Sequence, residues 1–259
     1  MTAILLDVDG VLHVSGEPVA GAADAVRSLR SAGHRLRFVT NNTTRARNRL
    51  AGELRAIGVE LDDDELQTTP AAAARELRGR RVLALTMAAI RDDLAGVELV
   101  GENAEAVLLG GADETVETHG VFSYENLSRA FAELDDGAEL YCLHRNRWWQ
   151  TKRGPLLDAG AFVAGLEYAA QTSATVLGKP SPAYFAAALA ALETKPAGAV
   201  MVGDDIESDV GGAQACGLRA VLVRTGKFRP GAVESSGVRP DAILPSIAAL
   251  PAWLEEQAA

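Results

Sequence analysis

Short apolar runs alternate along this chain with stretches in which apolar residues recur every three or four positions. In the first part, strands are predicted over 3–6 (AILL) and 35–40 (RLRFVT), and helices over 21–33 and 43–58. The second of these helices would be capped by Thr43 or Thr44. Because strands that alternate with helices pair in parallel through right-handed crossovers, the pattern predicts an α/β fold.

The same alternation returns after residue 174. Strands are predicted there over 175–177, 199–203, 219–226 and 241–244, and helices over 183–192 and 246–257. The intervening stretch has its own strands, predicted over 81–86, 104–110 and 138–144, and helices over 87–95 and 123–135. We therefore predict a doubly wound parallel-sheet core formed by residues 1–78 and 175–259, with a second α/β module, residues 79–174, inserted into it.

Composition and charge narrow the range of partners. The 259 residues include 25 Lys and Arg against 35 Asp and Glu, and the net charge is −10. This balance argues against a nucleic-acid partner, because a phosphate backbone would be repelled, but not against a local site for a small phosphate. Cys142 and Cys216 form no CxxC motif and are interpreted as buried thiols in a reducing compartment, with a disulfide or metal pair as the alternative. We find no signal-peptide pattern and no apolar run of membrane-spanning length, so we expect a cytoplasmic protein without a membrane partner.

Polar residues follow four of the predicted strands at the point where each strand ends. They are Asp7 and Asp9 after the first strand, Thr40, Asn41 and Asn42 after the second, Lys179 after the strand at 175–177, and Asp204, Asp205 and Asp209 after the strand at 199–203. Each alone has an ordinary explanation, such as a turn, a helix cap or a solvated lysine. In an open parallel sheet, however, ligands bind beyond the carboxyl ends of the strands. The joint occurrence predicts that these side chains form one site.

These residue types favour phosphoryl-transfer chemistry. Several carboxylates in oxygen-only surroundings are typical of a hard-cation site, and Mg²⁺ takes one or two carboxylates together with waters and a phosphate oxygen. A lysine and a hydroxyl beside the cation would hold the remaining phosphoryl oxygens. One aspartate could then attack phosphorus as a nucleophile, while a second protonated the leaving oxygen and later deprotonated water.

Four segments, LLDVDGVL, FVTNN, GKPSP and VGDDIESD, resemble in this order the four motifs of the haloacid dehalogenase-like (HAD) phosphatase superfamily. The insert falls between the second and third motifs. That position, together with TNN, resembles the 4-nitrophenylphosphatase (NagD-type) branch, in which a large α/β cap occupies this place. More narrowly, LEYAAQ, TVLGKPSP and GGAQACGLRAVLVRTGKFRPG resemble the phospholysine phosphohistidine inorganic pyrophosphate phosphatases and their close relatives. The resemblance implies a Rossmann-like HAD core with a substrate-selecting cap, and it allows a homodimer formed through the cap.

By motif position, the resemblance also implies a role for each residue of the site. Asp7 would be the nucleophile and Asp9 the general acid and base. The phosphoryl group would be held by Thr40, Asn41, Asn42 and Lys179. The magnesium ion would be held by the carboxylates of Asp7 and Asp204 and the backbone carbonyl of Asp9, with Asp205 and Asp209 holding its waters or Lys179.

Asp9 distinguishes between two reactions of this superfamily. Dehalogenases need no acid two residues after the nucleophile, whereas phosphoryl transfer to water does, so we predict a phosphatase. Its expected substrates are small phosphorylated metabolites, with pyrophosphate and N-phosphorylated compounds suggested by the narrower resemblance. Two alternatives stay open, namely a phosphotransferase or phosphomutase of the same fold, and a non-catalytic regulator that binds phosphate or protein.

The insert contains one basic and aromatic segment, LHRNRWWQTKRG at 143–154. In the family, the loop after this cap strand faces the active site, which makes Asn146, Arg147 and Trp148 candidate substrate contacts. Many NagD-type relatives have Asn-x-Asp at this place, whereas this chain has Arg147 and Trp148 after Asn146. A solvated hairpin and a subunit interface that buries Trp148 and Trp149 are the alternative interpretations.

Overall fold

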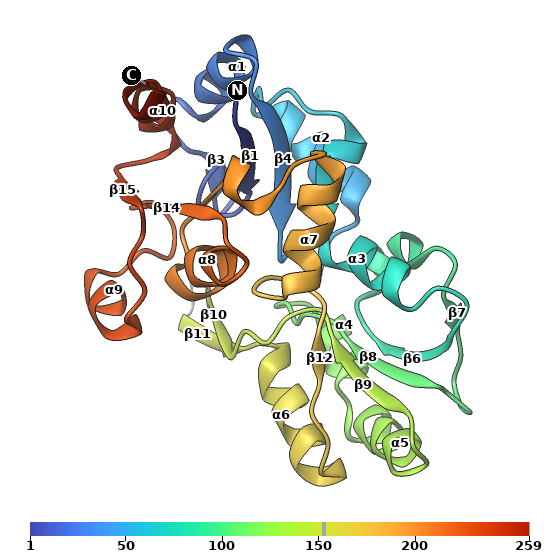
Figure 1. Ribbon diagram of the computed structural model, residues 1–259. Coiled ribbons are helices and arrows are strands. Elements are labelled where there is room, and N and C mark those ends of the chain that lie inside the picture. Colours follow the sequence, from blue (N-terminus) through green and yellow to red (C-terminus); the bar gives the residue numbers. More distant parts are fainter. Residues whose placement is uncertain (152–153, 259) are drawn as a thin grey trace. The chain divides into compact units, whose positions relative to one another are not determined.

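The computed structural model describes residues 1–151 and 154–258. The chain divides into two compact units, shown in Figure 1. The first unit consists of Met1–Thr40, Asn48–Gln67 and Lys179–Ala259, and the second of Asn41–Arg47 and Thr68–Gly178. In the described part of the chain, we find no helix whose length and apolar character would let it cross a membrane.

The first unit is built on a six-stranded sheet in the order β15-β14-β13-β1-β4-β5. Its strands are β1 (Ala3–Asp7), β4 (Arg35–Thr40), β5 (Leu66–Thr68), β13 (Ala199–Gly203), β14 (Arg219–Val223) and β15 (Ala242–Leu244). The first strand, β1, pairs in parallel with β13 on one side and with β4 on the other. The chain therefore leaves the middle of the sheet in both directions, and this confirms the predicted doubly wound α/β core.

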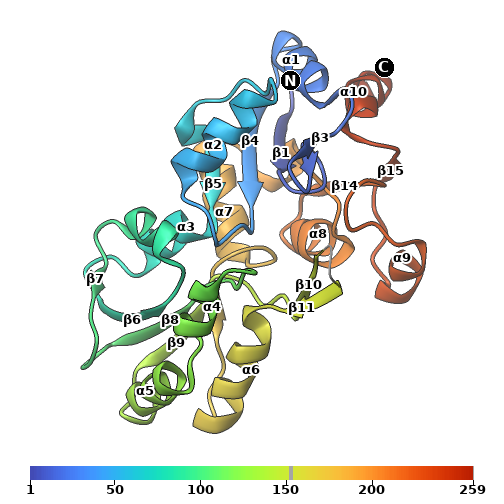
Figure 2. The ribbon, with the colours of Figure 1, turned by 180° about the vertical axis from the view of Figure 1, so that it is seen from behind.

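Helices cover both faces of this sheet. One buried cluster joins Ile4 and Leu6 of β1 to apolar side chains of α1 (Ala22–Ser31), α2 (Arg47–Ala56) and α10 (Leu250–Ala258). The helix α7 (Pro182–Ala191) lies in front of β4 in Figure 1 and behind it in Figure 2. Its neighbour is α8 (Gly212–Ala215), because Gly212 packs on Pro180 and Phe185. With both faces covered, every residue of β1 is buried, which explains its uninterrupted apolar run.

Shorter elements complete the first unit. They are the hairpin strands β2 (His13–Val14) and β3 (Glu17–Pro18), the 3₁₀ turns η1 (Asp63–Glu65), η3 (Pro196–Gly198) and η5 (Ile247–Ala249), the π-helical segment η4 (Ile206–Gly211) and the helix α9 (Pro230–Ser236). The segment η4 follows β13 after two residues. It therefore places the acidic residues of VGDDIESD at the carboxyl end of the sheet.

The second unit has its own five-stranded parallel sheet in the order β12-β9-β8-β6-β7. Its strands are β6 (Arg81–Leu85), β7 (Glu98–Leu99), β8 (Ala106–Leu109), β9 (Glu139–Cys142) and β12 (Thr175–Val176). One face packs on α4 (Val116–Val121), α5 (Tyr124–Asp135) and α6 (Ala159–Ala170), and the other on α3 (Thr69–Glu76) and the 3₁₀ helix η2 (Ala88–Leu94). A hairpin, β10 (Trp148–Thr151) and β11 (Gly154–Leu157), precedes α6.

Some predicted elements differ from the structure. The helix predicted over 87–95 is the 3₁₀ helix η2, and the strand predicted over 219–226 ends at Val223. The strand predicted over 175–177 does not belong to the core sheet, because β12 pairs with β9 in the sheet of the second unit. The helix predicted from Thr43 begins only at Arg47. The Thr43 hydroxyl lies 3.1 Å from Nε2 of His144, 101 positions along the chain, and the backbone N–H of Arg47 donates to Oδ2 of Asp93 over 2.7 Å. The pairing of β12 with β9 and the contacts of Thr43 and Arg47 join distant segments, which local periodicity does not encode.

Candidate active site

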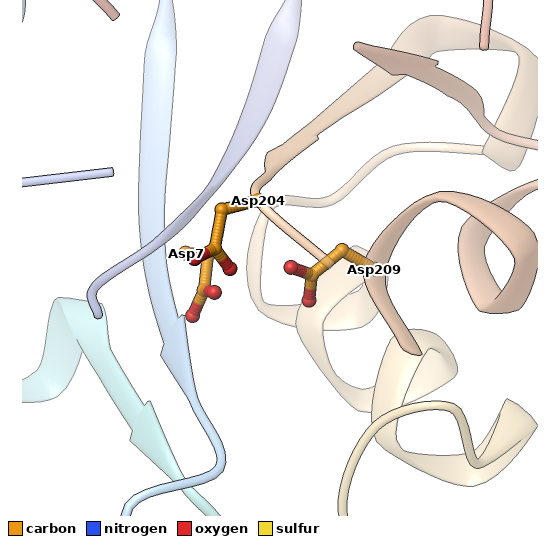
Figure 3. A group of neighbouring side chains, drawn as sticks. All are labelled: Asp7, Asp204 and Asp209. Carbon is orange, nitrogen blue, oxygen red and sulfur yellow. The ribbon is translucent and has the colours of Figure 1, made fainter. Parts of the chain in front are cut away.

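The carboxyl ends of three neighbouring strands of the first unit carry the polar residues predicted for the site. Asp7 is the last residue of β1, Thr40 is the last residue of β4, and Asp204 directly follows β13. The sheet order β13-β1-β4 makes β1 the strand from which the chain winds in both directions. This is the place where open α/β sheets bind their ligands. Figure 3 shows the carboxylates of Asp7, Asp204 and Asp209 pointing toward one another.

Lys179 lies among these carboxylates. Its ammonium Nζ is 2.7 Å from Oδ1 of Asp7 and 2.8 Å from Oδ1 of Asp209. The lysine is only 3% exposed, and both partners are buried as well. Burial alone would lower the pKa of Lys179, but the negative charges of Asp209 and Asp7 raise it above its ordinary value, so the side chain is a permanent cation. Lys179 follows the strand predicted for the core sheet, but that strand, β12, pairs with β9 in the sheet of the second unit.

Without a further positive charge, the ionised form of the buried acids is unfavourable. Burial raises the pKa of Asp7 to about 6, although the nearby Lys179 acts to lower it. Burial also raises the pKa of Asp204, and the nearby charge of Asp209 raises it further. In the same way, burial and then the charge of Asp7 raise the pKa of Asp209. Like charges in a small volume disfavour one another's ionised form. The group therefore gains by binding either protons or a cation.

Three observations indicate that the site fits a divalent cation. One carboxylate oxygen from each of Asp7, Asp204 and Asp209 lies within 4.8 Å of the others. Oδ1 of Asp204 is buried and has no hydrogen-bond partner among the described residues, which is costly unless something binds it. If Asp7, Asp204, Asp205 and Asp209 were all ionised, Lys179 and Lys227 would be their only ion-pair partners among the described residues, which would leave an excess of negative charge. Oxygen-only donors with this charge suit Mg²⁺.

Glycines allow the backbone to approach these carboxylates closely. A Cβ atom at Gly203 would lie 2.2 Å from Oδ2 of Asp209. A Cβ atom at Gly10, whose φ is +88°, would lie 1.9 Å from Oδ2 of Asp204. Any other residue at either position would displace a carboxylate. The glycine of DVDG is therefore required by the site as well as by the turn.

Asp9 lies in a different environment from the buried acids. Its side chain is 50% exposed and does not belong to the group formed by Asp7, Asp204 and Asp209. The hydroxyl of Thr40 donates to Oδ2 of Asp9 over 3.3 Å, and Nε2 of His13 lies 3.7 Å from Oδ1. This carboxyl group is open to solvent beside the buried acids, an arrangement that suits a residue exchanging protons with substrate and water.

Asp205 has a structural contact of its own. It caps η4, because its Oδ1 accepts hydrogen bonds from the backbone N–H groups of Glu207 and Ser208, each over 3.0 Å. Burial acts to raise its pKa, but Lys227 and these N–H groups hold that pKa below its ordinary value. The backbone N–H of Asp205 in turn donates to Oδ2 of Asp209 over 3.2 Å. Asp205 and Asp209 thus orient one another.

Three side chains at the site were not singled out from the sequence. The hydroxyl of Tyr184 accepts a hydrogen bond from the backbone N–H of Thr40 and lies 2.7 Å from the carbonyl oxygen of Gln67. Thr225 and Lys227 lie in the loop after β14 and contact Gly10 and Asp204. The tripeptide TGK at the end of the strand predicted over 219–226 was the available signal for that loop. No local pattern marks Tyr184, which lies within a mostly apolar helix.

The remaining predicted residues lie in the second unit. Asn41 and Asn42 belong to its first segment, where Oδ1 of Asn42 accepts hydrogen bonds from the backbone N–H groups of Thr44 and Arg45. The backbone N–H of Asn146 donates to Nδ1 of His144 over 3.2 Å. Arg147 precedes the hairpin strand β10, which begins at Trp148, and the Trp148 side chain is 52% exposed. Lys152 and Arg153 of the basic segment lie outside the described residues.

Two family models and a relative of known name match this chain. A family model described as haloacid dehalogenase-like hydrolase matches residues 4–100, and one described as HAD-hydrolase-like matches residues 176–250. A phospholysine phosphohistidine inorganic pyrophosphate phosphatase from Xenopus laevis is 40% identical over 254 residues, which cover 95% of this chain and 92% of the relative.

Solved structures resemble the fold over nearly its whole length. The p-nitrophenyl phosphatase from Archaeoglobus fulgidus superposes with a TM-score of 0.89 at 26% identity, covering 97% of this chain and 98% of that one. A glycerol phosphate phosphatase from Mycobacterium tuberculosis, in complex with magnesium, has a TM-score of 0.83 at 28% identity, covering 96% of this chain and 76% of that one.

Proposed function

The chain belongs to the haloacid dehalogenase-like hydrolases and is a phosphatase, and from that premise we propose that it hydrolyses small phosphorylated metabolites with the help of Mg²⁺. The observation that carries this proposal is the cluster of Asp7, Asp204 and Asp209 around Lys179 at the carboxyl end of the core sheet. A buried lysine beside a would-be nucleophile and an incompletely neutralised set of acids suits a phosphoryl group and a divalent cation.

We propose that the carboxylates of Asp7 and Asp204 and the backbone carbonyl of Asp9 hold the cation. Asp209 and Asp205 support this set, the former through Lys179 and the latter through the cap of η4. When bound, Mg²⁺ neutralises negative charge on the phosphoryl oxygens. Thr40 and Lys179 supply further donors for those oxygens, and Asn41 and Asn42 are proposed to assist.

The proposed reaction has two steps. In the first, a carboxylate oxygen of Asp7 attacks phosphorus and forms an aspartyl-phosphate, while the bond from phosphorus to the leaving oxygen breaks. Asp9 gives its proton to that oxygen. In the second step, Asp9 takes a proton from water, whose oxygen attacks phosphorus, and the bond from phosphorus to Asp7 breaks. Inorganic phosphate leaves, and both carboxyl groups return to their starting states.

We propose that residues 79–174 form the cap that selects the substrate, with Asn146, Arg147 and Trp148 as contacts. The relatives and structural neighbours are named for phospholysine, phosphohistidine, pyrophosphate, p-nitrophenyl phosphate and glycerol phosphate. These compounds share a small size and a terminal phosphoryl group, so pyrophosphate and N-phosphorylated compounds belong in the first substrate panel. The cytoplasmic location and the homodimer stay predictions.

The test is release of phosphate from 4-nitrophenyl phosphate, pyrophosphate and a metabolite panel, with Mg²⁺ and with EDTA. We expect turnover that requires Mg²⁺ and is lost in Asp7→Asn. The matched control is Asp135→Asn, because Asp135 is an exposed aspartate at the end of α5 and should leave turnover unchanged. Turnover by Asp7→Asn equal to that of the unmodified protein would contradict the mechanism.

A further inference from the structure

The loop that joins β14 to α9 contacts the candidate metal ligand Asp204. The backbone N–H of Lys227 donates a hydrogen bond of 2.6 Å to Oδ2 of Asp204. The other oxygen of the same carboxylate, Oδ1, is buried and has no partner among the described residues. One oxygen of Asp204 is therefore held by the loop while the other is left for a ligand.

Gly226 brings the loop backbone directly against this carboxylate. Its φ is +63°, and a Cβ atom there would lie 2.0 Å from Oδ2 of Asp204 and 2.6 Å from the Cα atom of Gly10. The second contact is with backbone, which a side-chain rotation would not relieve. The loop, Asp204 and the turn after Asp9 thus form one close-packed stack in which two glycines are required.

Thr225 connects the loop to the first motif. Its hydroxyl donates a hydrogen bond to the backbone carbonyl of Gly10, the residue after Asp9. The ammonium of Lys227 lies 3.5 Å from Oδ2 of Asp205, and its side chain is 60% exposed. The three residues therefore contact both acidic motifs of the site, although their contacts with Asp204 and Gly10 involve only the Thr225 hydroxyl and backbone atoms.

We propose that Thr225, Gly226 and Lys227 form a clip that orients the Asp204 carboxylate and the turn after Asp9 for binding the divalent cation. The proposal rests on the metal dependence proposed above. Holding Oδ2 stops the carboxylate from rotating and aims Oδ1 at the cation. The conformational entropy of the Asp204 side chain is therefore lost during folding and not during cation binding. The clip residues are positioning residues, because they act through Asp204 and Gly10.

The test is the affinity of the folded protein for Mg²⁺ alone, measured by calorimetric titration after treatment with EDTA. We expect Gly226→Ala to weaken Mg²⁺ binding at least about tenfold, or about 1.4 kcal/mol. The matched control is Gly237→Ala. Gly237 also has a positive φ, +71°, but a Cβ atom there meets nothing within 4 Å. It therefore reports backbone strain without displacing Asp204, and its Mg²⁺ affinity should stay within about twofold of the wild type.

Three further variants separate hydrogen bonding from charge. Thr225→Val removes the donor to Gly10 and should weaken Mg²⁺ binding about two- to tenfold, whereas Thr225→Ser keeps the hydroxyl and should restore it. Lys227→Ala keeps the backbone N–H and removes a positive charge near the site, so it should bind Mg²⁺ at least as tightly as the wild type. If Gly226→Ala fails to fold, the Thr225 pair decides the question.

The outcomes separate the clip from the proposed function. Absence of Mg²⁺ binding by the wild-type protein would overturn the metal dependence and the clip with it. Tight binding by the wild type, with equal affinity in Gly226→Ala and Thr225→Val, would overturn the clip alone. Equal weakening in Gly226→Ala and Gly237→Ala would also overturn it, because the effect would then come from backbone strain.

Discussion

Replacing Lys179 by Met should destabilise the metal-free protein strongly, because the lysine neutralises buried acids. Its Nζ lies 2.7 Å from Asp7 and 2.8 Å from Asp209. At an effective dielectric constant of about 20, each contact corresponds to a gross Coulomb attraction of roughly 6 kcal/mol. Desolvation of the buried ions offsets much of this attraction. Methionine keeps the length and apolar stem of the side chain, so the change removes mainly the charge.

The expected loss follows from breaking a buried ion pair on one side only. Such changes cost about 3–5 kcal/mol, because a buried charge is left uncompensated. Here two carboxylates lose the same partner. We therefore expect the free energy of unfolding in EDTA to decrease by an amount within or above that range. With a urea m-value of about 3 kcal/mol per molar, the unfolding midpoint would decrease by at least about 1 M.

The assay is urea unfolding followed by circular dichroism, in EDTA and in Mg²⁺. The control is Lys195→Met, since Lys195 is exposed and its replacement should change the free energy by no more than about 0.5 kcal/mol. Mg²⁺ should recover part of the loss in Lys179→Met, because it supplies positive charge to the same acids. A loss below about 1 kcal/mol in EDTA would refute the view that Lys179 holds the acids together.

Two other predictions concern proton transfer and pH. Asp9→Asn should lower the rate of turnover about 10²–10⁴-fold, because it removes the proposed general acid and base. Mg²⁺ affinity should be retained, because Asp9 is half exposed and its side chain lies outside the acid cluster. Steady-state rates and Mg²⁺ titration of the same preparation check this, and an unchanged rate would remove Asp9 from the mechanism. In EDTA, the folded protein should become more stable as the pH falls from 8 to 5.5, because the folded-state pKa of Asp7, about 6, exceeds the unfolded value of 3.8, so the folded form binds the extra proton. Urea unfolding at the two pH values tests this, with Asp7→Asn as the variant in which the gain should shrink.

The sequence alone determined the strands and the acids at their ends. Runs such as AILL and AVMVG are apolar throughout because both faces of a doubly wound sheet are covered, and each run stops where polar residues begin. Parallel strands bring their carboxyl ends to one edge, so Asp7, Thr40 and Asp204 could be assigned to one site without coordinates. The apolar character and length of each run are local properties, and the handedness of crossovers follows a general rule, so both are available from the sequence.

Only the tertiary structure decided which charges neutralise one another and what orients them. Lys179 contacts Asp7 across 172 positions although the strand before it pairs in the other sheet. The helix after Thr40 begins only at Arg47, whose backbone N–H donates to Asp93, and the Thr43 hydroxyl contacts His144. The loop at 225–227 reaches Asp204 and Gly10 through backbone atoms and one hydroxyl. Such contacts depend on how distant segments pack, and no periodicity within either segment records the identity of its partner.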